Sequence, residues 1–235
     1  MCINKKEGTT SIQIDSATVI GTLTLVKKPA GIVLFAHGSG SSRFSPRNRY
    51  VAQVLQQAGF ATLLLDLLTE EEDEIYENRF NIDLLTTRLW LTTKWVQKMF
   101  KDTSLPVGYF GASTGVACAL KAAADLGSQI RCIVSRGGRP DLAENELYRV
   151  KSPTLLIVGG DDTEVLALNR EAYRYLNCPK KLAIVKGATH LFEEPGALEE
   201  VTHLAADWFK KYLYARPIRN RKEELHGDFI HGKNF

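Results

Sequence analysis

The hydrophobic pattern of the chain changes near residue 30. Residues 10–27 alternate between apolar and polar positions, which is typical of two half-buried strands, with Asp15-Ser16 as the predicted turn. Beyond residue 30, short apolar runs predict strands that are buried on both faces. These runs cover residues 32–36, 61–65, 107–110 and 130–135, and two further strands are predicted at 154–158 and 181–185.

The segments between these strands carry apolar residues at helical spacing. They cover residues 46–58, 82–100, 114–126, 141–150, 163–176 and 196–214. Ser45-Pro46 favours a helix start, because serine caps a helix and proline fits its first position. Strands that alternate with helices predict an α/β fold: a mostly parallel twisted sheet with an N-terminal antiparallel hairpin and helices on both faces.

No repeat or linker divides the chain. We therefore expect residues 1–214 to form a single domain. Residues 215–235 lack periodicity and combine proline, arginine, histidine and glycine, which predicts a tail that is mobile or packed on a neighbouring surface. The polar N-terminus predicts no signal peptide, and the apolar runs are too short to span a bilayer.

Composition narrows the function classes. The 235 residues carry a net charge of +3 with acids and bases nearly balanced, so a nucleic-acid partner is not expected. The four cysteines lack C-x-x-C spacing, and Cys118 and Cys132 lie in apolar stretches, which predicts small core residues in a reduced, cytoplasmic protein. The acidic run at 70–74 predicts a solvated loop or the first turn of a helix.

The segment Gly111-Ala112-Ser113-Thr114-Gly115 joins a predicted buried strand to a predicted helix. It matches G-x-S-x-G, which in this context indicates a nucleophile elbow that presents a serine hydroxyl above a sheet. A side chain at either glycine would strike the neighbouring strand or helix. The alternative is a glycine-rich turn with an incidental serine.

Polar residues follow other predicted strands. Residues 37–40 follow the first buried strand, Asp161 and Asp162 follow the strand at 154–158, and His190 follows the strand at 181–185. The carboxyl ends of parallel strands meet at one edge of a sheet, which is where such folds bind ligands. A serine, an acid and a histidine in this chain order are typical of α/β-hydrolases.

From Gly21 to Tyr214 the chain resembles an α/β-hydrolase, and more closely the dienelactone-hydrolase-like group. That group has a compact core, so the resemblance implies that this chain has no large cap domain. The resemblance rests on four segments, namely residues 37–40, 111–115, 159–162 and 187–190. The namesake enzymes use a cysteine nucleophile, whereas this elbow holds Ser113. The resemblance with that departure implies a serine esterase or related acyl hydrolase.

The chemistry gives each residue a role. Ser113 would be the nucleophile, His190 its base, and a carboxylate would orient the imidazole. The resembling family places its acid after a Gly-Gly-x spacing, which favours Asp162 over Asp161, with Asp141 as a third candidate. The backbone N–H groups of Ser39 and Thr114 are the natural oxyanion hole. His37 is expected to make a structural hydrogen bond.

Four arginines follow strands at this edge, namely Arg43, Arg47, Arg136 and Arg139. Guanidinium groups suit carboxylate or phosphate, so Arg43 and Arg136 are candidate substrate-binding residues for an anionic ester or lactone. The alternative is that the arginines pair with the acids of the 70–74 run or with Asp141. No cluster has metal-ligand spacing, so neither a metal nor another cofactor is expected.

The sequence therefore predicts a serine hydrolase that cleaves a small carboxylic ester, thioester or lactone through an acyl-enzyme on Ser113. Two other classes remain open: a catalytically silent binding protein with the hydrolase fold, and an acyltransferase or amidase that uses the same triad. The expected partner is a small molecule, with no nucleic acid and no membrane, and a homodimer is compatible with the sequence.

Overall fold

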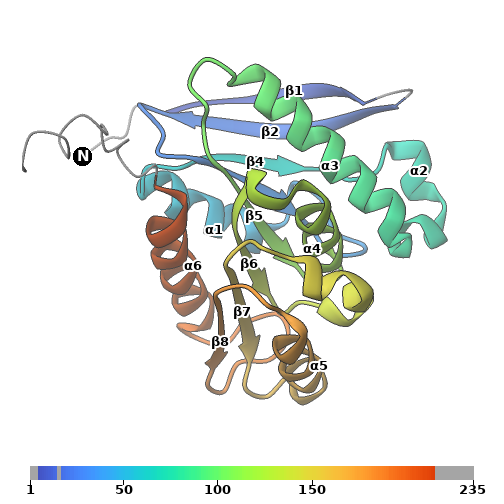
Figure 1. The fold of residues 1–235 in the computed structure, drawn as a ribbon, viewed down its shortest axis with the longest axis vertical. Coiled ribbons are helices and arrows are strands. Elements are labelled where there is room, and N and C mark those ends of the chain that lie inside the picture. Colours follow the sequence, from blue (N-terminus) through green and yellow to red (C-terminus); the bar gives the residue numbers. More distant parts are fainter. Residues whose placement is uncertain (1–4, 15–16, 215–235) are drawn as a thin grey trace, which may run out of the picture.

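The structure is a computed structural model that describes residues 5–14 and 17–214. One eight-stranded sheet runs through the described residues in the order β1-β2-β4-β3-β5-β6-β7-β8 (Figure 1). This mixed sheet and its helices confirm the predicted α/β-hydrolase fold. The predicted turn at Asp15-Ser16 and the predicted tail at 215–235 lie outside the described residues.

An antiparallel hairpin of β1 (Lys5–Ile14) and β2 (Ala17–Val26) forms one side of the sheet. β1 begins earlier than the alternation indicates, because its polar first half pairs through the backbone with β2, and Lys5 lies opposite Val26. The other strands are mutually parallel. They are β3 (Ile32–Ala36), β4 (Ala61–Leu65), β5 (Val107–Ala112), β6 (Ile130–Arg136), β7 (Thr154–Gly159) and β8 (Lys180–Val185).

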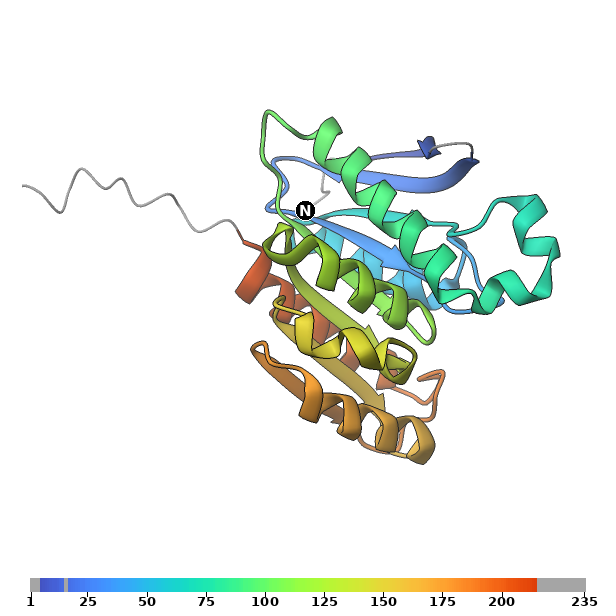
Figure 2. The same cartoon turned by 45° about the vertical axis from the view of Figure 1, so that its right-hand side comes forward.

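Helices cover both faces of the sheet (Figure 2). One face carries α3 (Ile82–Met99), α4 (Gly115–Leu126), α5 (Thr163–Tyr175) and the 3₁₀ segment η3 (Pro140–Arg149). The other carries α1 (Pro46–Gln57) and α6 (Ala197–Leu213). Short connections are α2 (Glu70–Glu74), η1 (Tyr76–Phe80) and η2 (Gly127–Gln129).

Two helix starts follow from capping. Ser45 accepts a hydrogen bond from the backbone N–H of Asn48 at 3.4 Å, as its position before Pro46 predicts. The acidic run at 70–74 forms the short helix α2, so of the two predicted alternatives the helix is found and the loop is not. Thr69 and Glu72 form a reciprocal capping box at its start, and acidic side chains are favoured in the first turn of a helix.

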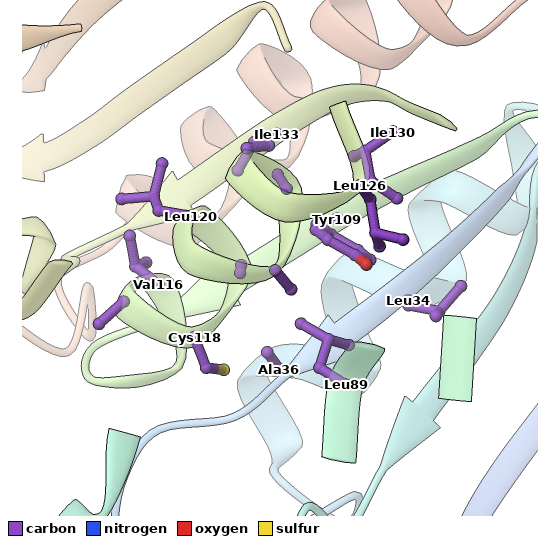
Figure 3. Close-up of a cluster of buried hydrophobic side chains, with 14 of the residues drawn as sticks. Leu34, Ala36, Leu89, Tyr109, Val116, Cys118, Leu120, Leu126, Ile130 and Ile133 are labelled. Atoms are coloured by element: carbon purple, nitrogen blue, oxygen red, sulfur yellow. The ribbon is translucent and has the colours of Figure 1, made fainter. Parts of the chain in front are cut away.

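The core lies on both sides of the central strands. Tyr109 of β5 is fully buried against α3 and α4 (Figure 3). Its hydroxyl lies 2.6 Å from Oγ1 of Thr93. Burial raises the pKa of this phenol, so it stays neutral. Cys118 and Cys132 are buried core residues, as predicted. In the described part of the chain, no helix has the length and apolar character needed to cross a membrane.

Helix α4 lies against the end of β3 because Gly115 has no side chain. A Cβ atom at Gly115 would lie 2.2 Å from the carbonyl oxygen of Ala36 and 2.4 Å from that of His37. A Cβ atom at Gly111 would lie 2.8 Å from Cα of Val116. The predicted steric need for these two glycines is therefore confirmed.

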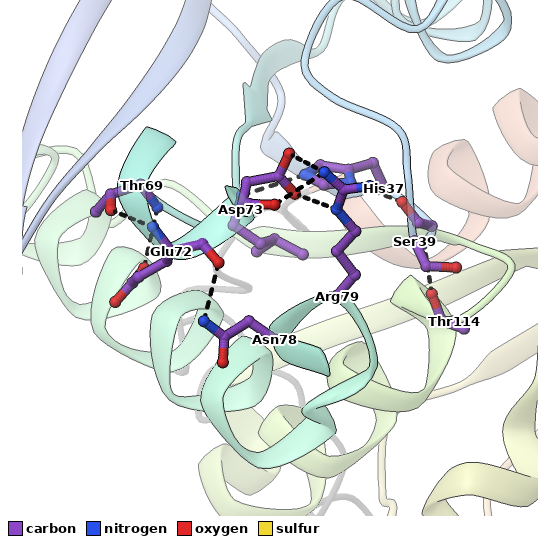
Figure 4. A network of polar contacts seen from close by, with 10 residues as sticks. His37, Ser39, Thr69, Glu72, Asp73, Asn78, Arg79 and Thr114 are labelled. Carbon is purple, nitrogen blue, oxygen red and sulfur yellow. Dashed lines mark hydrogen bonds and ion pairs between the residues drawn. The ribbon is translucent and has the colours of Figure 1, made fainter. Parts of the chain in front are cut away.

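His37 fastens the loop after β3 to the residues after β4. Its Nδ1 lies 2.9 Å from the carbonyl oxygen of Gly38, and its Nε2 lies 3.2 Å from the backbone nitrogen of Leu67 (Figure 4). A backbone N–H can only donate, so Nε2 accepts and Nδ1 carries the proton. Burial lowers the pKa of His37, which favours this neutral form. Both ring nitrogens have backbone partners, in keeping with the predicted structural role.

Replacement of Gly115 with alanine should lower the free energy of unfolding by about 3 kcal/mol or more, because the methyl group would overlap two backbone carbonyl oxygens. Urea unfolding measures the change. Gly8→Ala in β1 is the control, because a Cβ atom there would meet nothing within 4 Å. Equal stabilities of the two variants would show that α4 does not depend on this contact.

Acid should destabilise the protein partly through His37. Because its folded pKa is lowered, the unfolded chain takes up the proton first as the pH falls below the ordinary value of 6.5. The stability that neutral His37 contributes is complete above that pH and is lost below it. The fall in the free energy of unfolding below pH 6.5 should therefore be shallower in His37→Gln. His203→Gln, on the exposed face of α6, is the control, and an unchanged slope in His37→Gln would contradict the prediction.

Candidate active site

Five neighbouring parallel strands end at one edge of the sheet. In spatial order they are β3, β5, β6, β7 and β8. They are followed by residues 37–40, Ser113, residues 137–139, residues 161–162 and, after a longer loop, His190. The loop after β6 is a part of the site to which sequence reasoning gave no role beyond its arginines. Its backbone contacts connect Ser113 with His190.

Ser113 occupies a strained turn. Its φ is +51°, a left-handed conformation that costs a residue with a side chain about 1–2 kcal/mol. Three backbone hydrogen bonds hold it. The N–H of Ser113 donates to the carbonyl of Arg136 at 3.2 Å, and the carbonyl of Ser113 accepts from the N–H groups of Arg139 and Val116, each at 3.1 Å. A Cβ atom at Gly38 would lie 2.8 Å from Cβ of Ser113. The serine side chain therefore lies against the loop after β3.

Asp162 and His190 form a hydrogen-bonded pair. Nδ1 of His190 lies 2.7 Å from Oδ2 of Asp162. The Asp162 side chain is only 14% exposed, whereas that of His190 is 39% exposed. Of the other candidate acids, Asp141 is bound to Arg139 at 2.7 Å, and only the backbone of Asp161 makes hydrogen bonds within the described part of the chain. Of the three acids, Asp162 is the one in contact with the imidazole.

The position of Asp162 in the chain makes this contact informative. It is the N-cap residue of α5, yet its side chain accepts no hydrogen bond from the helix. Such a cap ordinarily stabilises a helix by about 1 kcal/mol. The carboxylate faces His190 instead, and accepts from Nδ1–H. This leaves Nε2 of His190 as the acceptor nitrogen of the ring.

The loop after β6 lies beside both Ser113 and His190. A Cβ atom at Gly137 would lie 3.5 Å from Cε1 and from Nδ1 of His190. Gly137 directly follows Arg136, whose carbonyl oxygen holds the backbone of Ser113. On the other side, a Cβ atom at Gly159 would lie 2.3 Å from the carbonyl oxygen of Ala188, so the loop that carries His190 packs directly on the end of β7.

The predicted oxyanion donors lie next to each other. The backbone N–H of Ser39 donates to Oγ1 of Thr114 at 2.8 Å (Figure 4). Within the described part of the chain, the backbone N–H of Thr114 has no protein partner. Thr114 can therefore offer its N–H to a ligand directly, whereas the N–H of Ser39 is occupied by the threonine hydroxyl.

The four arginines differ in their partners. Arg43 binds Asp66 through its side chain, and its backbone N–H donates to the same carboxylate at 2.7 Å. Arg139 pairs with Asp141, which was one of the predicted alternatives.

Arg47 pairs with Glu193 at 2.9 Å. Arg136 is buried and forms no ion pair with any described residue. Within the same residues, no group of three or more His, Cys, Asp or Glu side chains could hold a metal ion.

Comparison with known proteins places this site in a family. No family model matches the chain. A solved structure of a dienelactone hydrolase from Anabaena variabilis is 54% identical, with a TM-score of 0.86, and the match covers 89% of this chain and 99% of that one. Est1E from Butyrivibrio proteoclasticus has the same fold at 16% identity, with a TM-score of 0.75 over 87% of this chain and 98% of its own.

Curated relatives give a different name. Sequences from two strains of Mycobacterium tuberculosis, each named "Putative phosphoribosyl transferase", are 59% identical over 195 residues. The match covers 83% of this chain but only 44% of each relative, so the chain spans less than half of their length. The dienelactone hydrolase, in contrast, is matched over nearly its whole length. The chain therefore belongs to the dienelactone hydrolase family of α/β-hydrolases.

Proposed function

We propose that this protein is a serine hydrolase that cleaves a small carboxylic ester, thioester or lactone through an acyl-enzyme on Ser113. The observation that carries the proposal is the 2.7 Å contact between His190 and Asp162, at the edge where Ser113 is held in a left-handed turn. Membership of a hydrolase family and the esterase fold neighbours support the reaction class.

In this mechanism His190 Nε2 takes the proton of the Ser113 hydroxyl as the oxygen attacks the substrate carbonyl. Asp162 accepts Nδ1–H and stabilises the imidazolium that forms. The imidazolium then gives its proton to the leaving alcohol or thiol, and the acyl group stays on Ser113. His190 next activates water, which releases the acid and restores the hydroxyl.

The oxyanion that develops needs hydrogen-bond donors, and one such donor contributes about 3–4 kcal/mol. The free N–H of Thr114 is the first candidate. The N–H of Ser39 becomes the second when the Thr114 side chain rotates about χ1 and releases it. The oxyanion hole of this proposal is therefore completed when the substrate binds.

The environment of Cys118, the cysteine nearest to Ser113 along the chain, supports serine as the nucleophile. Cys118 lies one turn into α4 and is fully buried. Burial raises the pKa of its thiol to about 12, so it stays protonated and is a poor nucleophile at neutral pH. Cys118 therefore does not replace the cysteine of the namesake enzymes, and Ser113 is left as the nucleophile of the elbow.

The phosphoribosyl transferase name belongs to relatives of which this chain spans 44%, so that activity is not carried over. Acyl transfer and amide cleavage would use the same three residues as ester hydrolysis. Product analysis with water alone and with added alcohol or amine acceptors separates these reactions.

A fluorophosphonate probe should label the wild-type protein and fail to label Ser113→Ala. Hydrolysis of a p-nitrophenyl ester by Ser113→Ala should fall by roughly 10⁴-fold or more, because the nucleophile is lost. Ser39→Ala is the matched control, since only its backbone is assigned a role, and it should still be labelled. A folded wild-type protein that resists the probe would favour the silent binding protein instead.

The acid is tested by comparison of two neighbours. Asp162→Asn should lower kcat on a p-nitrophenyl ester by about 10³–10⁴-fold, because the amide can no longer hold the required tautomer of His190. Asp161→Asn should stay within a few-fold of wild type, since its carboxylate does not contact the imidazole. Circular dichroism checks the fold of both variants. Inactivity of Asp161→Asn alone would reverse the assignment.

A further inference from the structure

Arg136 is a buried cation without a counter-charge. The residue, at the end of β6, is 8% exposed, and its Nη1 is buried with no hydrogen-bond partner. No ion pair joins it to any residue in the described part of the chain. Burial lowers the pKa of its guanidinium to about 10, which still leaves it charged at neutral pH.

Another cation, Arg47, acts on Arg136. Repulsion from Arg47 lowers the pKa of Arg136 further. Arg47 lies in the first turn of α1, where the helix dipole adds positive potential. One nitrogen of Arg47 binds the exposed carboxylate of Glu193 at 2.9 Å, but its Nε is buried without a partner.

A buried charge that lacks a partner destabilises a fold, and ordinary structural arginines are paired. The chain provides that pairing elsewhere at this edge, for Arg43 with Asp66 and for Arg139 with Asp141. Arg136 lacks such a partner, and Arg47 has only the exposed carboxylate of Glu193. The unmet charge of Arg136 and its buried Nη1 without a partner therefore point to a ligand that brings negative charge.

The backbone of Arg136 lies next to that of the proposed nucleophile. The carbonyl of Arg136 accepts a hydrogen bond from the N–H of Ser113, and Arg136 lies opposite Ala112 in the sheet. The next residue, Gly137, packs on the ring of His190. The backbone at the end of β6 is therefore in direct contact with the residues of the proposed active site.

We propose that Arg136 and Arg47 bind a phosphate group of the substrate, so that the substrate class is a phosphorylated ester, thioester or lactone. This inference rests on the proposed hydrolase function for the reaction, but not for the binding site. Phosphate fits better than carboxylate, because it carries nearly two negative charges and three terminal oxygens. Both guanidinium groups can then donate to one ligand group.

Arg136→Met tests the site, because it removes the charge and keeps an unbranched side chain. Inorganic phosphate is the probe, read as the rise in Tm that it causes and as competitive inhibition of p-nitrophenyl ester hydrolysis. Phosphate should raise the Tm of the wild type and inhibit it competitively. In Arg136→Met the rise in Tm should be lost, and the inhibition constant should increase by about tenfold or more.

If Arg136 had only a structural role, its replacement would lower the Tm, whereas the proposal predicts no such loss. In phosphate-free buffer, Arg136→Met should keep or raise the Tm of the wild type, because an unpaired buried charge has been removed. A lowered Tm together with a retained response to phosphate would overturn the proposal. Arg131→Met, at the other and exposed end of β6, is the matched control and should respond to phosphate as the wild type does.

Two further control experiments test phosphate binding separately from hydrolysis. Ser113→Ala should keep the rise in Tm with phosphate, so a failure of the hydrolase proposal and a failure of the phosphate site are separate results. Acetate at the same ionic strength should have little effect. If acetate stabilised the wild type as strongly as phosphate, or if phosphate had no effect on the wild type, the assignment of a phosphate group would be wrong.

Discussion

The contact between α4 and the end of β3 governs the geometry of the whole active edge. Gly115 allows the first turn of the helix to lie on the carbonyl oxygens of Ala36 and His37, where any side chain would overlap them. With the helix fixed there, only Ser113 and Thr114 connect β5 to α4, so the chain must turn sharply. Ser113 therefore takes its left-handed conformation. The loops after β3 and β6 then close around that turn.

Three departures from locally favoured structure gather at this edge. Ser113 has a positive φ, Asp162 stands at a helix start without capping it, and Arg136 keeps a charge in a buried position. Each costs stability. Local preferences are met at many other positions, as in the Ser45 cap and the buried hydroxyl pair of Tyr109, although Lys28 and Ser104 also have positive φ. Such a concentration of unfavourable choices is typical of a site under functional selection.

Most of the fold could be predicted from the sequence, because runs buried on both faces and amphipathic helices leave distinct periodicities. The start of β1 could not, since its polar residues are held by backbone pairing alone. The loops that carry Ser113, Asp162 and His190 follow from strand order. The contacts of Arg43 with Asp66 and of Ser39 with Thr114 do not, because they depend on loop backbone conformations that no pattern encodes.

The two outermost strands of the sheet have a consequence for association between chains. A free strand edge presents unpaired backbone groups and can template pairing with another chain. β1 begins with the exposed Lys5-Lys6, and β8 begins with Lys180-Lys181, of which Lys181 is exposed. Lysine at a strand edge opposes such pairing by charge repulsion and by the cost of desolvation. The lysines at both edge strands therefore oppose the edge-to-edge pairing of sheets that leads to aggregation.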